Sequence, residues 1–447
     1  MATAAAISSV PGLFKKSYGN IPTNLVPAGN VFQEDLPMDE RKRVGESYVE
    51  CVVLSHETGV TFGGSSAEVV DINPAIAGVV KQAELKDYQM ILGSVIPFQT
   101  LSRSAEKGQQ AFESASKHVV KNNLKSHHCF LEIALLYGQS DAGLGYVSYT
   151  SATYRGVAFT NGAATLNSIV FATGGVDTTN KHILLAPGSF AAGVWTGMDG
   201  VKVKQIATSD GSVVGSGKLV AVNSEYGYVT VDFTPTAATS ATSHKLVFDG
   251  WENSLEMPGI FKIMQNTGTL FSISATTYPL WKASSYAAYS SGTTAGKLTF
   301  AKLQKAVAVA VNRAGLDTDV TVYVNPRSWE TLLTEQAGLK SDDSSYSPEK
   351  AERGQKAIRF YSQNGLITVK ASRHMKEGFA LVLDLDTWSR FGSASVSFKV
   401  PGTDMELILP LTNQTGWSFR SYSSQCVLCS APARNVLVTD INDEAAS

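Results

Sequence analysis

The chain has 447 residues and a formal net charge of −2, from 37 lysines and arginines against 39 aspartates and glutamates. This balance excludes a strongly basic nucleic-acid-binding protein and a protein with an acidic tail. Charged residues make up 17% of the chain, below the usual quarter, which indicates that much of the surface is covered, most simply by further copies of the chain. The length is enough for two or three domains.

Cysteine content and hydropathy exclude two further classes of protein. Four cysteines are too few for a disulfide scaffold of this size, so we expect a reducing compartment. The first 20 residues lack the charged start and apolar centre of a signal peptide. No stretch approaches 18 consecutive apolar residues, so we expect no membrane span.

Residues 1–46 carry no regular apolar pattern. Prolines at 11, 22, 27 and 37 and scattered glycines prevent long helices or strands there. Such a segment cannot bury a core of its own. It is therefore either a disordered tail or an arm that docks on neighbouring subunits, and we favour the arm.

Residues 47–101 are expected to form an extended hairpin. Two valine-rich, strand-like runs, 47–61 and 88–98, are separated by a mixed segment that contains Lys81 and Lys86. A two-stranded hairpin is marginally stable by itself. It must lie on another surface, and a neighbouring subunit is one candidate.

Residues 102–138 are predicted to form one long helix. The segment has no proline, and its apolar residues recur at helical spacing from Phe112 to Leu135. Its length would be roughly 50 Å, and Gly138 suits the left-handed position that ends a helix. Such a rod is unusual in an enzyme but fits a protein that spans a thin, wide plate.

The rest of the chain divides into a β-rich and a mixed part. Residues 184–250 alternate apolar and polar residues and predict a small inserted β-domain. Beyond Trp251 the pattern is mixed, with a helix over 299–315, a strand over 320–324 and a helix that begins at Pro326. Further strands are expected from 366 to 440.

The search for chemistry finds no catalytic, cofactor-binding or metal site. Residues 211–219, GSVVGSGKL, superficially resemble a phosphate-binding loop, but Ser212 replaces a required glycine and Leu219 the magnesium-binding hydroxyl, so we expect a β-hairpin. The pair Cys426 and Cys429 has no second pair to complete a zinc site, and buried structural cysteines are expected. His127, His128 and Cys129 are consecutive on a helix and point in different directions.

The order of these segments resembles the major capsid proteins of tailed bacteriophages, which have the HK97-type fold. Four stretches carry the resemblance. ERKRVGESYVECVVLSHETGVTF (40–62) is similar to the entry to that family's extended loop (the E-loop), and AFESASKHVVKNNLKSHHCFLEIALLYGQ (111–139) is similar to its spine helix. GLITVKASRHMKEGFALVLDLDTWSRF (365–391) is similar to the segment that returns to its peripheral domain. The run from 259 to VNPRSWETLL (324–333) resembles its axial domain.

The resemblance implies an α+β capsid fold with an extra β insertion. Its expected parts are an N-terminal arm (1–46), the E-loop (47–101), the spine helix and the first part of the peripheral domain (102–183), the inserted β-domain (184–250), the axial domain (251–345), and the returning peripheral and axial strands with the C-terminus (346–447). The insertion departs from the simplest members of the family.

The function that the resemblance implies is assembly and not catalysis. Subunits would form hexamers and pentamers of an icosahedral head around double-stranded DNA, which they would contact non-specifically. The expected protein partners are a scaffolding protein, a portal and a decoration or cement protein. The head would assemble in the host cytoplasm. Candidate intersubunit ion pairs are Asp39, Glu40, Arg41, Arg43, Lys81, Glu84, Lys86 and Asp87, with ordinary solvated charge as an equal alternative. An encapsulin-like compartment, or a soluble binding protein or enzyme that uses the β-domain, are the other readings.

Overall fold

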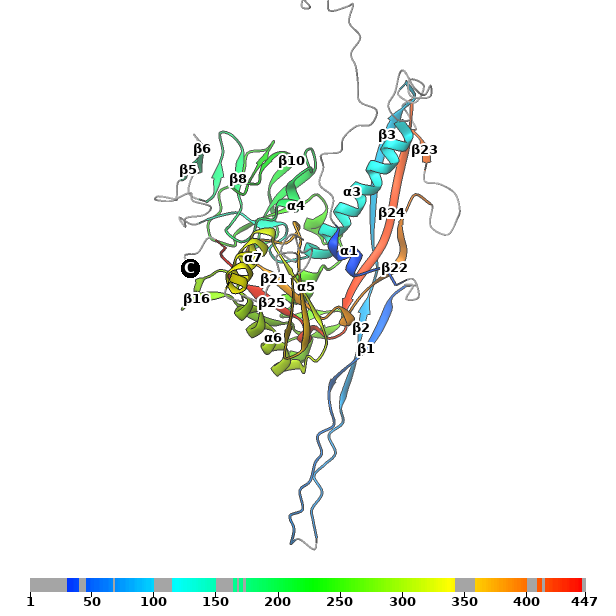
Figure 1. Cartoon of the computed structure of the whole chain (residues 1–447). Coiled ribbons are helices and arrows are strands. Elements are labelled where there is room, and N and C mark those ends of the chain that lie inside the picture. The colour runs from blue at the N-terminus through cyan, green and yellow to red at the C-terminus, as the bar shows by residue number, and fades with distance from the viewer. Residues whose placement is uncertain are drawn as a thin grey trace, which may run out of the picture.

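The computed structural model of the chain describes residues 30–39, 46–66, 69–99, 115–149, 164–166, 169–171, 174–341, 358–399, 408–411 and 415–443. The fold is mixed α+β, with several sheets and few helices. A long helix lies beside a tall, narrow sheet, two broader sheets form the body next to it, and a thin hairpin projects away from the body (Figure 1).

The long helix α3 spans Ala115–Tyr137 in the described residues. Its end confirms the predicted end of the helix, whereas 102–114 lie outside the described residues. The left-handed residue is Gln139, with φ 54°, and not Gly138 as expected. Gly138 is required for another reason: a Cβ there would lie 2.0 Å from the carbonyl oxygen of Met257, and its own carbonyl accepts a hydrogen bond from the amide of Gly259 at 2.8 Å.

The tall sheet beside α3 has four strands: β3 (Tyr88–Pro97), β22 (Trp388–Ser397), β23 (Ile408–Pro410) and β24 (Gly416–Cys429). Strand β24 is central, and it pairs with the whole of β3 antiparallel. The ring of His127 attaches α3 to this sheet, because its Nδ1 and Nε2 each lie 2.8 Å from a serine hydroxyl of β24, those of Ser421 and Ser423.

The pairing expected for the hairpin is wrong in its second strand. Strand β1 (Tyr48–Ser55) pairs antiparallel with β2 (Val79–Leu85), and not with the run 88–98, which is β3. The sequence of β2 is VVKQAEL, and its charged and amide residues make the strand hard to recognise from the sequence. Its Ala83 and Leu85 are nevertheless buried.

The second sheet has six strands in the order β15 (Ser284–Ala287), β25 (Val436–Thr439), β21 (Ala380–Leu383), β18 (Val320–Val324), β20 (Gly365–Ala371) and β19 (Ile358–Ser362). Helices α6 (Phe300–Ala314) and α7 (Pro326–Ser341) belong to this part. The sequence predicted both helices correctly. The hydroxyl of Thr299 caps the first turn of α6, and Gly315 ends the helix with φ 62°.

The third sheet has seven strands in the order β4 (Gly145–Tyr146), β12 (His244–Phe248), β9 (Lys202–Ala207), β10 (Val213–Asn223), β11 (Tyr228–Val231), β8 (His182–Leu184) and β7 (Val176–Asp177). Most of it falls in the predicted β segment 184–250, but three of its strands begin before that segment. The phosphate-loop-like run 211–219 lies in the expected β-hairpin, formed by β9 and β10.

Shorter elements connect the three sheets. The helical ones are α1 (Val31–Asp35), α4 (Ala192–Trp195), α5 (Ile260–Met264) and the 3-10 turns Trp251–Asn253, Pro279–Trp281, Leu385–Thr387 and Pro432–Arg434. Three small ribbons are β5 (Ala164–Leu166) with β6 (Ile169–Phe171), β13 (Thr269–Leu270) with β14 (Ile273–Ser274), and β16 (Tyr289–Ser291) with β17 (Thr294–Ala295).

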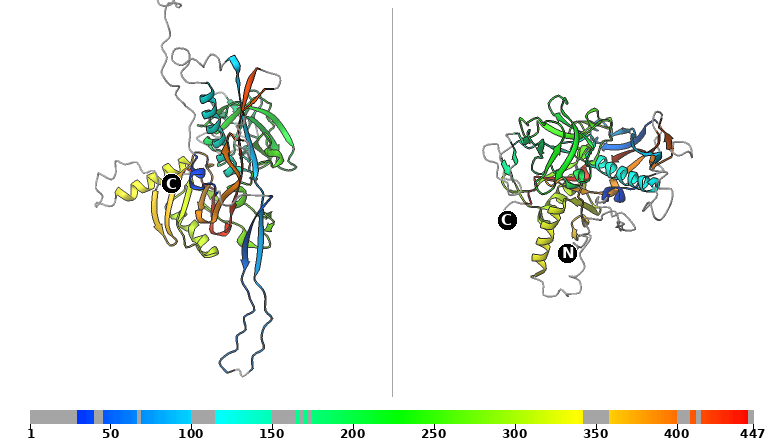
Figure 2. Two further views of the ribbon diagram at one scale, coloured as in Figure 1. Left: turned by 90° about the vertical axis from the view of Figure 1, so that its right-hand side faces the viewer. Right: turned by 90° about the horizontal axis from the view of Figure 1, so that it is seen from above.

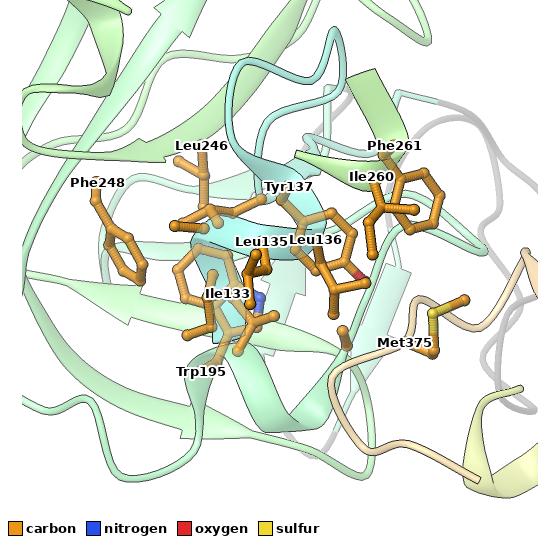
Figure 3. Packing of buried hydrophobic residues seen from close by; sticks show 14 of the residues in the cluster. Ile133, Leu135, Leu136, Tyr137, Trp195, Leu246, Phe248, Ile260, Phe261 and Met375 are labelled. Carbon is orange, nitrogen blue, oxygen red and sulfur yellow. The ribbon is translucent and has the colours of Figure 1, made fainter. Parts of the chain in front are cut away.

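The largest hydrophobic core surrounds the C-terminal end of α3. Ile133, Leu135, Leu136 and Tyr137 are fully buried there, on several faces of the helix. Residues from α4, α5 and β12 surround them (Figure 3). The end of α3 is therefore the point at which the body of the protein is fixed to the tall sheet.

Candidate subunit interface: the projecting hairpin

The hairpin formed by β1 and β2 projects far beyond the rest of the molecule (Figures 1 and 2). Beyond the strands, the two chains of its loop remain side by side. The amide of Thr58 donates to the carbonyl of Ile76 at 3.0 Å, and the amide of Asn73 donates to the hydroxyl of Thr61 at 2.8 Å. Gly59 permits this approach, because a Cβ on it would lie 2.9 Å from the Cα of Ala75.

The base of the hairpin is fixed by a separate small core. Leu54, Ala83 and Leu85 are buried in it against Phe391 of β22 and Leu428 of β24. The inner end of the hairpin is thus rigidly joined to the tall sheet.

A carboxylate secures the link between β2 and β3. Oδ2 of Asp87 accepts hydrogen bonds from the amide of Ser393 at 3.1 Å and from the hydroxyl of Ser424 at 2.7 Å. Burial by itself would raise the pKa of Asp87, but these hydrogen bonds outweigh it and hold the pKa below its usual value. Asp87 therefore acts inside its own chain, at the base of the hairpin.

The outer part of the hairpin exposes large apolar side chains. Phe62 is 91% exposed and Ile72 is 86% exposed, and the other exposed apolar residues of the hairpin are Val49, Val53, Val60, Val69, Val70, Ile76 and Val80. The exposure of so many large apolar side chains on one segment is a mark of an interaction site. The sequence located this segment but gave no sign that its apolar residues would be exposed together.

The tall sheet also exposes apolar side chains, on the face turned away from α3. Ile91 and Val95 of β3 are more than half exposed there. They alternate with Met90, Leu92 and Ile96, which are covered to a greater extent. These three lie on the same face of the strand as Ser94, whose hydroxyl accepts a hydrogen bond from Asn123 of α3 at 2.8 Å. The sheet therefore presents a second apolar surface outside the hairpin.

The structure separates the residues that the sequence grouped as candidate contacts. Lys81 and Glu84 are both exposed, three positions apart on β2, and therefore lie on opposite faces of the ribbon. Lys86 is exposed in the link after β2. Asp39 lies elsewhere, where its amide donates to the carbonyl of Arg390 at 2.7 Å. Glu40, Arg41 and Arg43 fall outside the described residues.

Two of the cysteines and one of the histidines that the sequence search considered as possible site residues are buried in the protein interior. Cys426 and Cys429 are free and buried in β24, and burial raises the pKa of each thiol to about 12. Burial also lowers the pKa of His127 to about 4, so it is neutral between its two serines. Within the part of the chain that the structure describes, no group of three histidines, cysteines or carboxylates is placed to hold a metal ion.

An apolar groove of about 590 Å³ lies between α3, β3 and β12, where Phe130, Phe248 and Trp251 line it. These aromatic rings meet edge to face, with centroids 5.4 Å apart in each neighbouring pair. Among the described helices, none is long and apolar enough to cross a membrane.

Comparison with known proteins gives a match in structure alone. No protein-family model matches the chain, and no curated protein matches its sequence. A chain of the cyanophage A-1(L) capsid asymmetric unit superposes with a TM-score of 0.56 at 9% identity, over 98% of this chain and 99% of that chain.

Weaker likenesses follow. They include the capsid of a native GTA particle (TM-score 0.46, 8% identity, 98% and 100% covered) and the SrpI encapsulin from Synechococcus elongatus PCC 7942 (TM-score 0.42, 6% identity, 100% and 99% covered). Both are too distant to support an argument about function. The likeness to the cyanophage chain shows the fold: this chain has the fold of a phage capsid protein, over almost its whole length.

Proposed function

We propose that this protein is the major capsid protein of a tailed bacteriophage and that it is a structural protein, not an enzyme. Copies of it form the hexamers and pentamers of an icosahedral head that encloses double-stranded DNA. The observation that carries the proposal is the projecting hairpin, whose apolar side chains Phe62 and Ile72 have no cover within the described part of their own chain. The capsid fold of the cyanophage A-1(L) chain supports it.

In this proposal the parts of the chain take the roles they have in the HK97-type fold. Segment 47–101 is the E-loop, α3 lies in the spine helix, 251–345 is the axial domain, and 346–447 returns to the peripheral and axial sheets. Segment 184–250 is the core of an inserted β-domain, and 1–46 is an arm.

The hairpin of one subunit lies across the adjacent subunit. Such a contact would remove Phe62 and Ile72 from water, and it could in turn cover the exposed face of β3 at Ile91 and Val95. The exposed charges Lys81, Glu84 and Lys86 on and beside the hairpin would then pair with the neighbour. The weak contacts of many subunits add by avidity, and interfaces of this obligate kind bury thousands of Å² in total.

The partners of the proposed head follow from the same reasoning. A scaffolding protein, a portal and a decoration or cement protein accompany the shell, which assembles in the host cytoplasm and becomes part of the virion. Contact with the packaged DNA is non-specific, and it is modest in strength because the net charge of −2 offers no strong attraction for phosphates.

Electron microscopy of the purified protein, alone and co-expressed with its neighbouring genes, tests the proposal. Closed shells that contain nucleic acid in infected cells support it. Shells that contain a protein cargo and no nucleic acid would instead support the encapsulin-like alternative. A persistent monomer or small oligomer under all of these conditions would refute both.

A further inference from the structure

A short segment before the hairpin fastens together parts of the molecule that are distant in sequence. We infer that residues 30–39 form a releasable clasp between α3 and the six-stranded sheet, and that the buried carboxylate of Glu132 is its latch. This inference concerns the single subunit and holds whether or not the subunit assembles. Figure 1 shows α1, which forms half of the clasp, lying against α3.

The carboxylate of Glu132 holds the first turn of α1 from outside. Asn30 precedes this helix but makes no side-chain cap. Instead, the amide of Phe32 donates to Oε1 of Glu132 at 2.8 Å, and the amide of Gln33 donates to Oε2 at 3.1 Å. Glu132 itself is fully buried in α3. Amides that normally need a local cap are thus satisfied by a residue 100 positions away.

The side chain of Gln33 adds a second layer to the latch. Its Nε2 donates to the carbonyl of His128 at 2.6 Å and to Oε2 of Glu132 at 3.2 Å. Its Oε1 lies 2.7 Å from Nδ1 of His128. The entry of the clasp is therefore fixed to one turn of α3 by a set of polar contacts.

The other side of the clasp is fixed to the six-stranded sheet. Phe32 is fully buried, with its ring centroid 4.2 Å from that of Tyr323 in β18. Asp35 accepts a hydrogen bond from the hydroxyl of Tyr323 at 2.5 Å and forms an ion pair with Lys370 of β20 at 2.6 Å. One turn of helix therefore joins α3 to two strands of another sheet.

The manner of attachment makes the clasp separable from the folded body. Apart from the isolated bridge between Met38 and Arg390, residues 30–39 pair with no strand among the described residues. Phe32 and Leu36 are the buried apolar residues that the clasp contributes. Release would thus cost the burial of Phe32 and Leu36 together with the polar contacts described above, and it would leave every strand of the three sheets paired.

The charges around Glu132 determine how release depends on pH. Arg390 of β22, Tyr323 of β18 and Cys129 of α3 interact with its charge. His128 of α3 binds the same Gln33 side chain as Glu132, and Asp35 of α1 binds the hydroxyl of the same Tyr323. Burial raises the pKa of Glu132 to about 7, although the amides of the clasp oppose this shift. Release exposes the carboxyl to water and returns its pKa toward the ordinary value of 4.5. Between these two pKa values the docked state keeps a proton on Glu132 that the released state has lost. Docking therefore weakens as the pH rises from about 4.5 to 7.

Control of the clasp by His128 would give the opposite dependence of docking on pH. Burial and the charge of Arg390 lower its pKa, so the docked state disfavours the protonated ring, and docking through His128 would strengthen as the pH rises. The direction of the pH dependence therefore identifies which group controls the clasp.

Hydrogen–deuterium exchange of the full-length, unassembled chain tests the inference, read by mass spectrometry on peptides that cover 31–36 and corrected for intrinsic exchange rates. We expect protection of this segment to be about tenfold higher at pH 5.5 than at pH 7.5, while peptides from β18 and β24 do not change. Glu132→Gln is expected to abolish the difference between the two pH values. Gln33→Ala is expected to lower protection at both and to preserve their ratio.

Two results would overturn the inference. One is protection of 31–36 that rises with pH or does not change. The other is loss of protection in 31–36 only together with loss in β18 and β24, which would show that the clasp does not open separately. Because the wild-type profile alone can give either result, the test remains decisive even if Glu132→Gln does not fold.

Discussion

The hydroxyl of Ser424 lies 2.7 Å from Oδ2 of Asp87, and this hydrogen bond joins the link between β2 and β3 to the central strand of the tall sheet. Asp87 is the point at which the chain leaves the hairpin and enters the body. Its carboxylate also binds the amide and the hydroxyl of Ser393. The direction in which the hairpin projects is therefore fixed at its base by three hydrogen bonds to one carboxylate.

Replacing Asp87 by alanine is expected to destabilise the subunit by about 1 kcal/mol or more, because the amide of Ser393 loses its charged acceptor. Thermal unfolding monitored by circular dichroism measures the effect. Lys86→Ala is the matched control, since Lys86 is the exposed neighbour and should leave the melting temperature unchanged. The pKa of Asp87 is lowered in the folded chain, so its stabilisation is present above the ordinary pKa and declines as the pH falls below it. Equal melting temperatures for the two variants would contradict this role.

Gly138→Ala is expected to destabilise the junction between α3 and the body by about 1–3 kcal/mol, as overpacking does. The added methyl group would lie 2.0 Å from the carbonyl of Met257, so the backbone must move. Gly93→Ala in β3 is the control, because no heavy atom lies within 4 Å of its added Cβ. Urea unfolding of both variants measures the difference. A variant at Gly138 as stable as the one at Gly93 would show that the junction tolerates the side chain.

Lys376→Met is expected to flatten the dependence of stability on pH in the alkaline range. Lys376 is buried, its Nζ donates to the carbonyl of Gly143 at 2.8 Å, and burial lowers its pKa to about 7. Since the unfolded chain holds this proton up to about pH 10.5, the stability of the wild type should rise with pH between 7 and 10.5. Melting temperatures at pH 7, 8.5 and 10 test the slope. An identical slope in wild type and variant would exclude Lys376 as its source.

Phe62→Ser combined with Ile72→Ser is expected to leave the stability of the isolated subunit within about 0.5 kcal/mol, because both side chains are exposed. The same variant should lose most of its assembly, which sedimentation velocity measures as the fraction of protein in large particles. Thr58→Ser with Thr61→Ser is the control, since it keeps the hydroxyl of Thr61 that binds Asn73 and removes no large apolar group. Normal assembly of the Phe62 and Ile72 variant would exclude the apolar surface of the hairpin as a contact.

The sequence predicted the elements whose signals are local. Thr299 caps the start of α6, and Gly315 ends the helix in the left-handed conformation. The proline at 326 begins α7. Val320–Val324 is apolar at alternate positions and is a fully buried strand. Each of these signals depends on residues within a few positions, so the sequence is sufficient to read it.

Features that depend on distant residues could not be predicted. The pairing of β1 with Val79–Leu85 is set by the core against Phe391 and Leu428 and not by the polar sequence of the strand. Gly138 is required by the backbone of Met257, more than 100 residues away, and not by its own φ angle. The same holds at the candidate interface, where the charge pattern did not indicate that Ser393 and Ser424 would bind the carboxylate of Asp87.

A cryo-electron-microscopy map of assembled particles tests the central claim most directly, because it shows where the hairpin of each subunit lies. The account predicts closed shells in which residues 56–78 of one subunit rest on the adjacent subunit, with Phe62 and Ile72 covered by it. A protein that forms no shell, or a shell in which each hairpin folds back onto its own subunit, would contradict it.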